Sequence, residues 1–177
     1  MKKMVIGSIV TLLHTQIMAQ PCTAVMGQLN CKDQQLSELR HQGRVLLDGV
    51  KVLGGTGVQG ALTTSGSVFQ GPIQMDGLLE MRQTTAQKNL HCRGLVNAHG
   101  SRFGGDLDIQ GREMHLHDSQ AKNIRMKHNH DPITLYLTGK TTVAGNVVFD
   151  GGPGRVVKDK TAHINGRVTG GTVEEQT

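Results

Sequence analysis

Short runs in which apolar and polar residues alternate recur along this chain with a spacing of 17 residues. The repeat is clearest in four consecutive units, residues 44–60, 61–77, 78–94 and 95–111. Alternation with a period of two is typical of short strands that bury one face. The second, fourth, thirteenth and fifteenth positions are mostly apolar and hold, in turn, Val45, Leu62, Leu79 and Val96; Leu47, Thr64, Met81 and Ala98; Thr56, Ile73, Leu90 and Leu107; and Val58, Met75, Cys92 and Ile109.

Glycines separate the apolar pairs and mark where the predicted strands bend, because glycine permits the backbone angles that tight bends need. The columns are Gly43, Gly60, Gly77, Gly94 and Gly111 at the seventeenth position, Gly54, Gly71, Gly105 and Gly139 at the eleventh, and Gly49, Gly66 and Gly100 at the sixth. Each unit therefore predicts three strands joined by three bends. The expected fold is all-β: a three-sided, single-stranded β-solenoid (β-helix) over residues 44–171.

The later units depart from this regular spacing. Residues 112–128 begin one residue late, residues 129–132 interrupt the pattern, and the unit 146–166 contains 21 residues. In that last unit Val147 and Phe149 are assigned to the second and fourth positions, and Gly145 and Gly166 join the set of corner glycines. With stacked strands about 4.8 Å apart, about seven turns predict a rod of roughly 30–35 Å.

Both ends of the chain differ from the repeats. Residues 1–19 predict a signal peptide, with cleavage after Ala24, or an uncleaved first segment, as alternatives. Residues 20–43 are expected to cap the open end of the coil, with residues 33–40 as either a short helix or an irregular first turn. Residues 172–177 are expected to be a polar tail. No later segment is apolar for long enough to span a membrane.

The composition fits a thin, glycine-rich coil. The 177 residues include 24 Gly but only three Phe, one Tyr and no Trp, so aliphatic and small residues must form the core. The formal net charge of +5 falls to +3 once Lys2 and Lys3 are removed with the signal peptide. Because no aromatic platform accompanies this mild positive charge, nucleic acid is not an expected partner.

The three cysteines have two different expected roles. Cys22 and Cys31 are nine residues apart and could form a disulfide in an oxidising compartment, unless cleavage after Ala24 removes Cys22. Cys92 falls on an inward position of its unit, where we expect a buried free thiol that packs as a small hydrophobic residue.

Histidines gather where the repeat is interrupted. His115 and His117 lie on the same side of a predicted strand, and the one-residue slip brings His117 close to His99 of the preceding turn. His99, His115 and His117 are therefore candidate ligands for a divalent metal ion, with Asp118 nearby. The alternative is that they are solvent-exposed surface histidines. A second candidate set consists of His128, His130 and Asp131.

The acidic residues give no catalytic signature. Asp106 and Asp108 alternate on one predicted strand, with Asp76 and Glu80 in neighbouring turns. A glycan-cleaving β-helix needs a carboxylate pair in a cleft, and the repeats lack the long loops that build one. We therefore expect these carboxylates to be solubilising charges, and expect no enzymatic activity and no cofactor other than a metal ion.

The units with alternating apolar residues and glycine corners, such as LVNAHGSRFGGDLDIQG (residues 95–111) and TLYLTGKTTVAGNVVFDGG (residues 134–152), resemble bactofilins, the polymer-forming β-solenoid proteins of bacteria. The resemblance covers residues 44 to about 171. It implies a three-sided β-helix and end-to-end assembly with copies of itself. The chain departs from the family in its predicted export, because bactofilins are cytoplasmic.

These features together predict an exported, non-enzymatic structural β-solenoid, located in the periplasm, on the cell surface or outside the cell. It would act as a scaffold or assemble with itself. The alternative function is a module that binds a ligand or a metal ion through the histidine-rich surface of residues 99–130.

Overall fold

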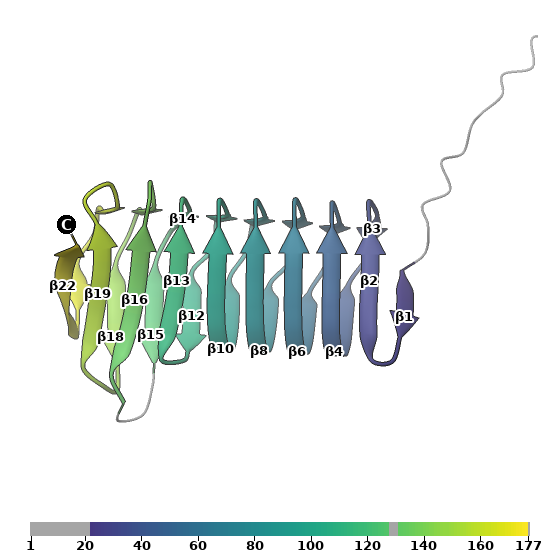
Figure 1. Ribbon diagram of the computed structural model, residues 1–177, viewed down its shortest axis with the longest axis horizontal. Helices are drawn as coiled ribbons and strands as arrows, with labels where there is room; N and C mark the ends of the chain where they lie inside the picture. Colours follow the sequence, from purple (N-terminus) through teal and green to yellow (C-terminus); the bar gives the residue numbers. More distant parts are fainter. Residues whose placement is uncertain (1–21, 128–130, 177) are drawn as a thin grey trace, which may run out of the picture.

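The protein is a rod of stacked β-coils. We describe it from a computed structural model that defines residues 22–127 and 131–176. Within these ranges every regular element is a strand, which confirms the predicted all-β solenoid with roughly 17-residue coils. Figure 1 shows the coils side by side along the long axis, from β2 near one end to β22 at the other. The predicted signal peptide, residues 1–19, lies outside the described residues.

Two sides of the coil belong to one sheet, which has 14 strands among the described residues. Its first coils use ten-residue strands that bend at a central glycine: β4 (Leu39–Asp48), β6 (Thr56–Ser65), β8 (Ile73–Arg82) and β10 (Leu90–His99). Later coils use two separate strands: β12 (Leu107–Gln110) and β13 (Glu113–His117), β15 (Ile124–Lys127) and β16 (Ile133–Thr138), β18 (Val147–Asp150) and β19 (Gly154–Asp159), and β21 (Val168–Thr169) and β22 (Gly171–Gln176).

Short strands form the third side, a second sheet of eight strands in the described part of the chain. These two-residue strands are β3 (Gln35–Leu36), β5 (Lys51–Val52), β7 (Val68–Phe69), β9 (Thr85–Ala86), β11 (Arg102–Phe103), β14 (Gln120–Ala121), β17 (Thr142–Val143) and β20 (His163–Ile164). The coil makes about nine turns, more than the seven expected. The additional turns come from the chain ends, which the sequence had assigned to a cap and a tail.

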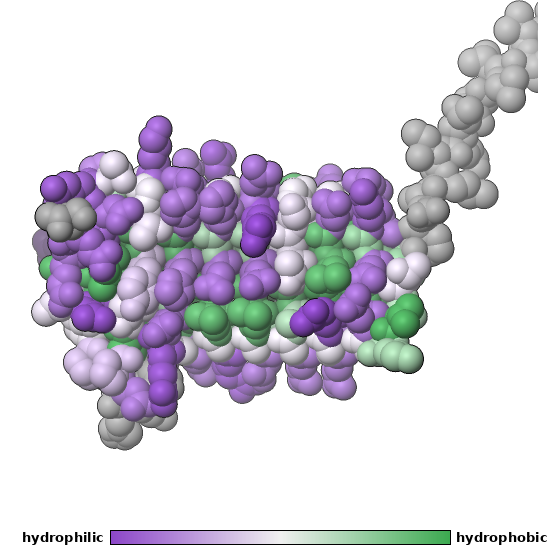
Figure 2. Space-filling model, viewed as in Figure 1, coloured by the Kyte–Doolittle hydropathy of each residue, from purple (hydrophilic) through white to green (hydrophobic). Residues whose placement is uncertain are grey.

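Parallel pairing places equivalent residues of successive coils next to each other. Gly60 pairs with Gly43 on one side and Gly77 on the other, and Leu62 lies between Val45 and Leu79. The inward columns are almost completely buried and make one continuous apolar core. Outward columns are mostly polar, and Figure 2 shows hydrophilic residues in rows along the rod with narrower hydrophobic areas between them.

The register of the last coils differs from the one predicted. Val147 and Phe149 pair with Ile124 and Met126, so they occupy the thirteenth and fifteenth positions rather than the second and fourth. Gly145 and Gly166 consequently lie at corners of the eleventh-position column, next to Lys122 and Gly145 respectively, and not in the column of Gly43. Gly139 moves to the sixth position, where its φ of 61° matches Gly49, Gly66 and Gly100.

The N-terminal end is covered by a short antiparallel strand. β1 (Thr23–Val25) pairs with β2 (Gln28–Lys32), and a disulfide joins Cys22 to Cys31. β2 and β3 already form a coil that pairs with β4 and β5. The helical alternative for residues 33–40 is therefore wrong, and most of the segment predicted as a cap, residues 20–43, is solenoid.

The C-terminal end also differs from the prediction, since residues 171–176 form β22 instead of a polar tail. Its inward column ends in charge: Lys158 lies beside buried Leu137, and Glu175 lies beside Lys158. The Lys158 ammonium forms an ion pair with the Glu175 carboxylate, although the lysine side chain is only 18% exposed. Inward-pointing charges of this kind discourage another strand from adding to a sheet edge.

Acid is expected to loosen this C-terminal coil. The hydrogen bond and charge of Lys158 hold the pKa of Glu175 below its ordinary value of 4.5. A carboxyl with a lowered folded pKa stabilises the fold above its unfolded pKa, and this contribution disappears as pH falls through the folded value. We expect amide protection of β22 to fall below about pH 4.5, as measured by hydrogen exchange relative to intrinsic rates.

Two substitutions on the same strand check this assignment. Glu175→Gln should show low protection of β22 at neutral pH and lose the acid response. Glu174→Gln is the matched control, because Glu174 lies on the other face of β22 in an exposed pair with Arg155. An acid response that survives Glu175→Gln would assign it to other groups.

Candidate metal centre

The candidate site lies at the ends of β10 and β13, at an edge of the rod. His99 and His117 are the last residues of these strands, and they pair directly in the parallel register. The one-residue insertion near Arg112 makes them 18 rather than 17 positions apart in sequence, so the predicted slip and its effect on His117 are confirmed. Arg82 precedes His99 in this column, and Thr138 follows His117.

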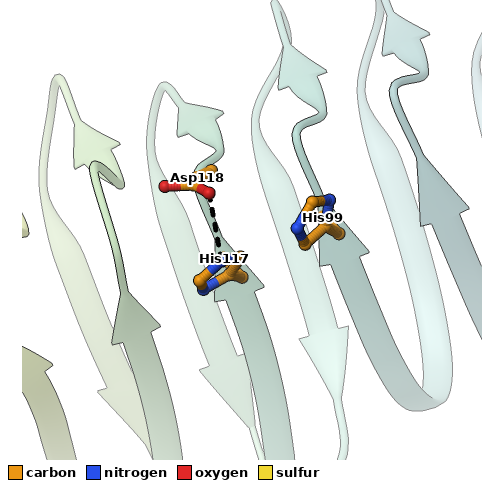
Figure 3. Close-up of side chains that lie close together, drawn as sticks. All are labelled: His99, His117 and Asp118. Carbon is orange, nitrogen blue, oxygen red and sulfur yellow. Dashed lines mark ion pairs between the residues drawn. The ribbon is translucent and has the colours of Figure 1, made fainter.

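His99, His117 and Asp118 bring three potential ligand atoms together. The two imidazole rings stack with their centroids 4.7 Å apart and their planes 25° from parallel. His117 Nε2 lies 3.0 Å from Asp118 Oδ2. One donor atom from each residue lies within 4.8 Å of the other two, and all three residues are solvent-exposed. Figure 3 shows the carboxylate of Asp118 directed at His117, with His99 on the neighbouring coil.

Asp118 reaches this position because it occupies a corner of the coil. Its φ of 47° is left-handed, in a column that holds Gly49, Gly66, Gly100 and Gly139 but also Asp33 and Gln83. Aspartate tolerates this conformation better than most residues with a side chain. Its Oδ1 accepts a hydrogen bond of 2.8 Å from the backbone N–H of Lys140. A Cβ at residue 139 would lie 2.3 Å from that oxygen, so Gly139 gives the carboxylate its space.

The environment of Asp118 favours its charged form. The pKa of this carboxyl is lowered, first by the hydrogen bond from the Lys140 amide and then by the positive charges that His117, His99 and Lys140 can carry. The carboxylate is therefore ionised at neutral pH. One oxygen is held by the backbone, and the other is directed at His117.

A ladder of buried hydroxyl groups fixes the backbone beneath the two histidines. The Ser101 and Ser119 hydroxyls donate to the carbonyl oxygens of His99 and His117 at 3.1 and 2.8 Å. The backbone N–H of Ser101 in turn donates to Ser119 Oγ at 3.1 Å. The same arrangement continues through Thr141, whose Oγ1 accepts the N–H of Ser119. These side chains lie at the seventh position of their coils, and sequence analysis missed their inward orientation.

His115 does not belong to the cluster, although the sequence made it a candidate ligand. Its ring stacks on Tyr136 with a centroid distance of 4.4 Å, and its Nε2 lies 3.5 Å from Glu113 Oε2. It lines the same shallow depression of about 450 Å³ as His99 and His117. However, His115 and His117 are alternate residues of one strand, and such residues are about 6.5 Å apart along the chain. Asp118 directly follows His117 and is therefore the third member of the donor cluster.

The other candidate residues are accounted for differently. His128 and His130 lie outside the described residues, and Asp131 forms an ion pair with Arg112 at 2.6 Å. The carboxylates considered for glycan cleavage contact neighbouring coils instead of forming an isolated pair. Their partners are Arg93 for Asp76, Thr63 for Glu80, Asn123 for Asp106 and His91 for Asp108.

No family model, curated protein or solved structure matches this chain. The functional argument therefore rests on the geometry described above.

Proposed function

We propose that this protein is an exported, non-enzymatic structural β-solenoid that acts as a rigid scaffold. The observation that carries the proposal is the continuous stack of coils, in which parallel pairing runs from β2 to β22 around one apolar core that extends from Cys31 to Ala162. Several outward carboxylates contact neighbouring coils, as in the Arg93–Asp76 pair at 2.9 Å. Such contacts join the coils, and they leave no isolated carboxylate pair in a cleft among the described residues. The resemblance to bactofilins belongs to this proposal.

The disulfide supports export. Disulfides persist in oxidising compartments and are rare where the cytosol keeps thiols reduced. The Cys22–Cys31 bond anchors the start of β1 on β2. Export with cleavage after Ala19 would retain this bond, whereas cleavage after Ala24 would remove Cys22 and most of β1. We therefore favour the first cleavage position and a periplasmic, surface or extracellular location.

The two ends favour a discrete rod over an endless polymer. Unpaired strand edges act as templates for other strands, but β1 covers β2 at the N-terminal end. At the C-terminal end, the inward pair Lys158–Glu175 interrupts the apolar column. End-to-end assembly would have to displace β1 at one end or bury the Lys158–Glu175 pair at the other. Self-assembly is therefore the second form of the scaffold proposal, and it requires one end to be opened.

Particle size and shape test the scaffold proposal. We expect light scattering and negative-stain microscopy of the oxidised protein to show single-chain rods over a wide concentration range. In the Cys22→Ser/Cys31→Ser variant, β1 is no longer anchored and association through the exposed edge of β2 should increase. Filaments of the oxidised protein would contradict the shielding argument and support polymerisation. Globular particles of either form would contradict the scaffold itself.

A binding module is the second candidate function, because a specific feature favours it. His99, His117 and Asp118 bring three donor atoms to one exposed point of the rod. A scaffold does not need this arrangement, which places two histidines in register at strand ends and a carboxylate at a corner.

A further inference from the structure

We propose that His99, His117 and Asp118 bind a divalent transition-metal ion of the zinc, nickel or copper class. The inference rests on the second candidate function and names its ligand. Two imidazole nitrogens and one carboxylate oxygen suit these ions, whereas calcium and magnesium prefer oxygen ligands alone. Three protein ligands at an exposed site leave at least one coordination position for water or for a further ligand.

The hydrogen bonds of His117 provide the strongest argument for a cation. Thr138 Oγ1 lies 3.5 Å from the carbonyl oxygen of Leu116 and 2.9 Å from Nδ1 of His117. In the tautomer of His117 that carries its proton on Nδ1, this N–H donates to Thr138 Oγ1. In that tautomer, neutral His117 presents the lone pair of Nε2 to Asp118 Oδ2, which lies 3.0 Å away. Two lone pairs that face each other need a positive charge between them, either a proton or a metal ion.

The His117 imidazole and the Asp118 carboxylate each have a second hydrogen-bond partner of the kind that metal ligands typically have. A metal-binding imidazole usually donates its second N–H to an oxygen, and a ligating carboxylate is usually itself hydrogen-bonded. Thr138 would serve the first role for His117, and the Lys140 amide serves the second for Asp118. Both partners hold the side chains in place without an ion, so little reorganisation is needed on binding.

The backbone places the three donor atoms close enough to one another for a single ion to contact all of them. Ligand atoms about 2.1 Å from a tetrahedral ion are about 3.4 Å from one another. The three donors already lie within 4.8 Å, and rotation of the exposed His99 ring can close the difference. The Ser101 and Ser119 hydroxyls hold the carbonyl oxygens of His99 and His117. The opposing factor is Arg82, which pairs with His99 in the register and places a positive charge in the same depression.

Calorimetric titration of the purified protein with zinc and nickel chloride tests the proposal. We expect one ion per chain for the unmodified protein. His99→Ala, His117→Ala and Asp118→Asn should each weaken binding by more than about 10-fold, because a loss of direct ligands exceeds the effect typical of their outer partners. Asp118→Asn keeps a residue that tolerates the left-handed corner. Arg82→Gln should strengthen binding. Magnesium and calcium should not displace the bound ion.

His115→Ala is the matched control, since His115 is a partly exposed residue of the same strand and lines the same depression but lies outside the donor cluster. It should leave the affinity unchanged, as should the His128→Ala/His130→Ala double variant, which removes another closely spaced histidine pair of the sequence. Circular dichroism of every variant checks that the coil is intact.

Two outcomes would overturn the proposal. One is the absence of stoichiometric binding by the unmodified protein. The other is a loss of metal affinity in His115→Ala equal to that in His117→Ala. That result would assign binding to the histidine pair on β13 instead of the cluster that includes Asp118. Neither outcome affects the scaffold proposal, which is decided by particle shape. The second candidate function would survive these outcomes if the histidine-rich surface bound a ligand other than a metal ion, and His99→Ala should then weaken that binding.

Discussion

We expect Gly94→Ala to destabilise the solenoid by about 3 kcal/mol or more, in spite of adding only one methyl group. Gly94 has a φ of 141°, which residues with a side chain rarely adopt. A Cβ at this position would lie 1.9 Å from the carbonyl oxygen of Gly77 in the preceding coil. The clashing atom belongs to the backbone, so the coils themselves would have to move apart. Urea denaturation measures the loss.

Gly57→Ala is the matched control for this substitution. Gly57 also lies in a long strand, β6, but a Cβ there meets nothing within 4 Å and its φ is not in the left-handed region. Replacing it should change stability by less than about 1 kcal/mol, and could raise it by restricting the unfolded chain. If both variants unfold at the same urea concentration, the close approach of glycines between coils does not limit stability.

The period of the sequence was sufficient to predict the coil, because burial in a solenoid repeats with the chain. Val45, Leu62 and Leu79 are apolar for the same reason: each lies at one inward point of successive coils. A structure in which each turn contacts only its neighbours carries this information locally. For that reason, a single sequence predicts its fold class and the number of sides of its coil.

The register of the last coils could not be predicted in the same way. Glycine marks all three corners, so Gly145 looks the same at the eleventh position as at the seventeenth. Val147 and Phe149 alternate equally well on either of two sides. β15 ends at Lys127 and β16 begins at Ile133, and β18 ends at Asp150 and β19 begins at Gly154, so extra residues separate segments that form single strands in the first coils. Counting from glycine to glycine loses the phase at these insertions, whereas strand pairing restores it.

The candidate site was predicted in part. The slip in the repeat identified His99 and His117 as neighbours, since their pairing depends only on register. Asp118 could have replaced His115 in the prediction, because it follows the strand at the sixth position, where Gly49, Gly66 and Gly100 mark a corner. The bond from the Lys140 amide that aims its carboxylate has no signal in the sequence.

The inward hydroxyl ladder is not predicted by the alternation of apolar and polar residues, because polar side chains ordinarily face solvent. Ser67, Thr84 and Ser101 share the seventh position of successive units, so the column was visible. At a tight corner, backbone N–H groups need partners that the strands do not supply. A hydroxyl meets this need by accepting one N–H and donating to a carbonyl oxygen two residues earlier, as Ser101 does.

We expect Phe103→Ala to cost about 3–5 kcal/mol, towards the upper end of that range. Phe103 is 3% exposed and pairs with Ala86 of the preceding coil, and Ala121 holds the same position in the next coil. Large and small residues alternate along this column, since Phe69 lies on the other side of Ala86. Replacing Phe103 would leave three alanines in succession. No large neighbour in the column could then fill the space.

Leu53→Ala provides the control, because Leu53 is 38% exposed and its loss opens no internal cavity. It should cost less than about 1 kcal/mol in the same urea denaturation experiment. Since each coil is supported only by its neighbours, a cavity at Phe103 should also reduce the cooperativity with which the two halves of the rod unfold. A reduced urea dependence of unfolding would then accompany the loss of stability. A cost for Phe103→Ala as small as that for Leu53→Ala would show that neighbouring coils collapse into the space.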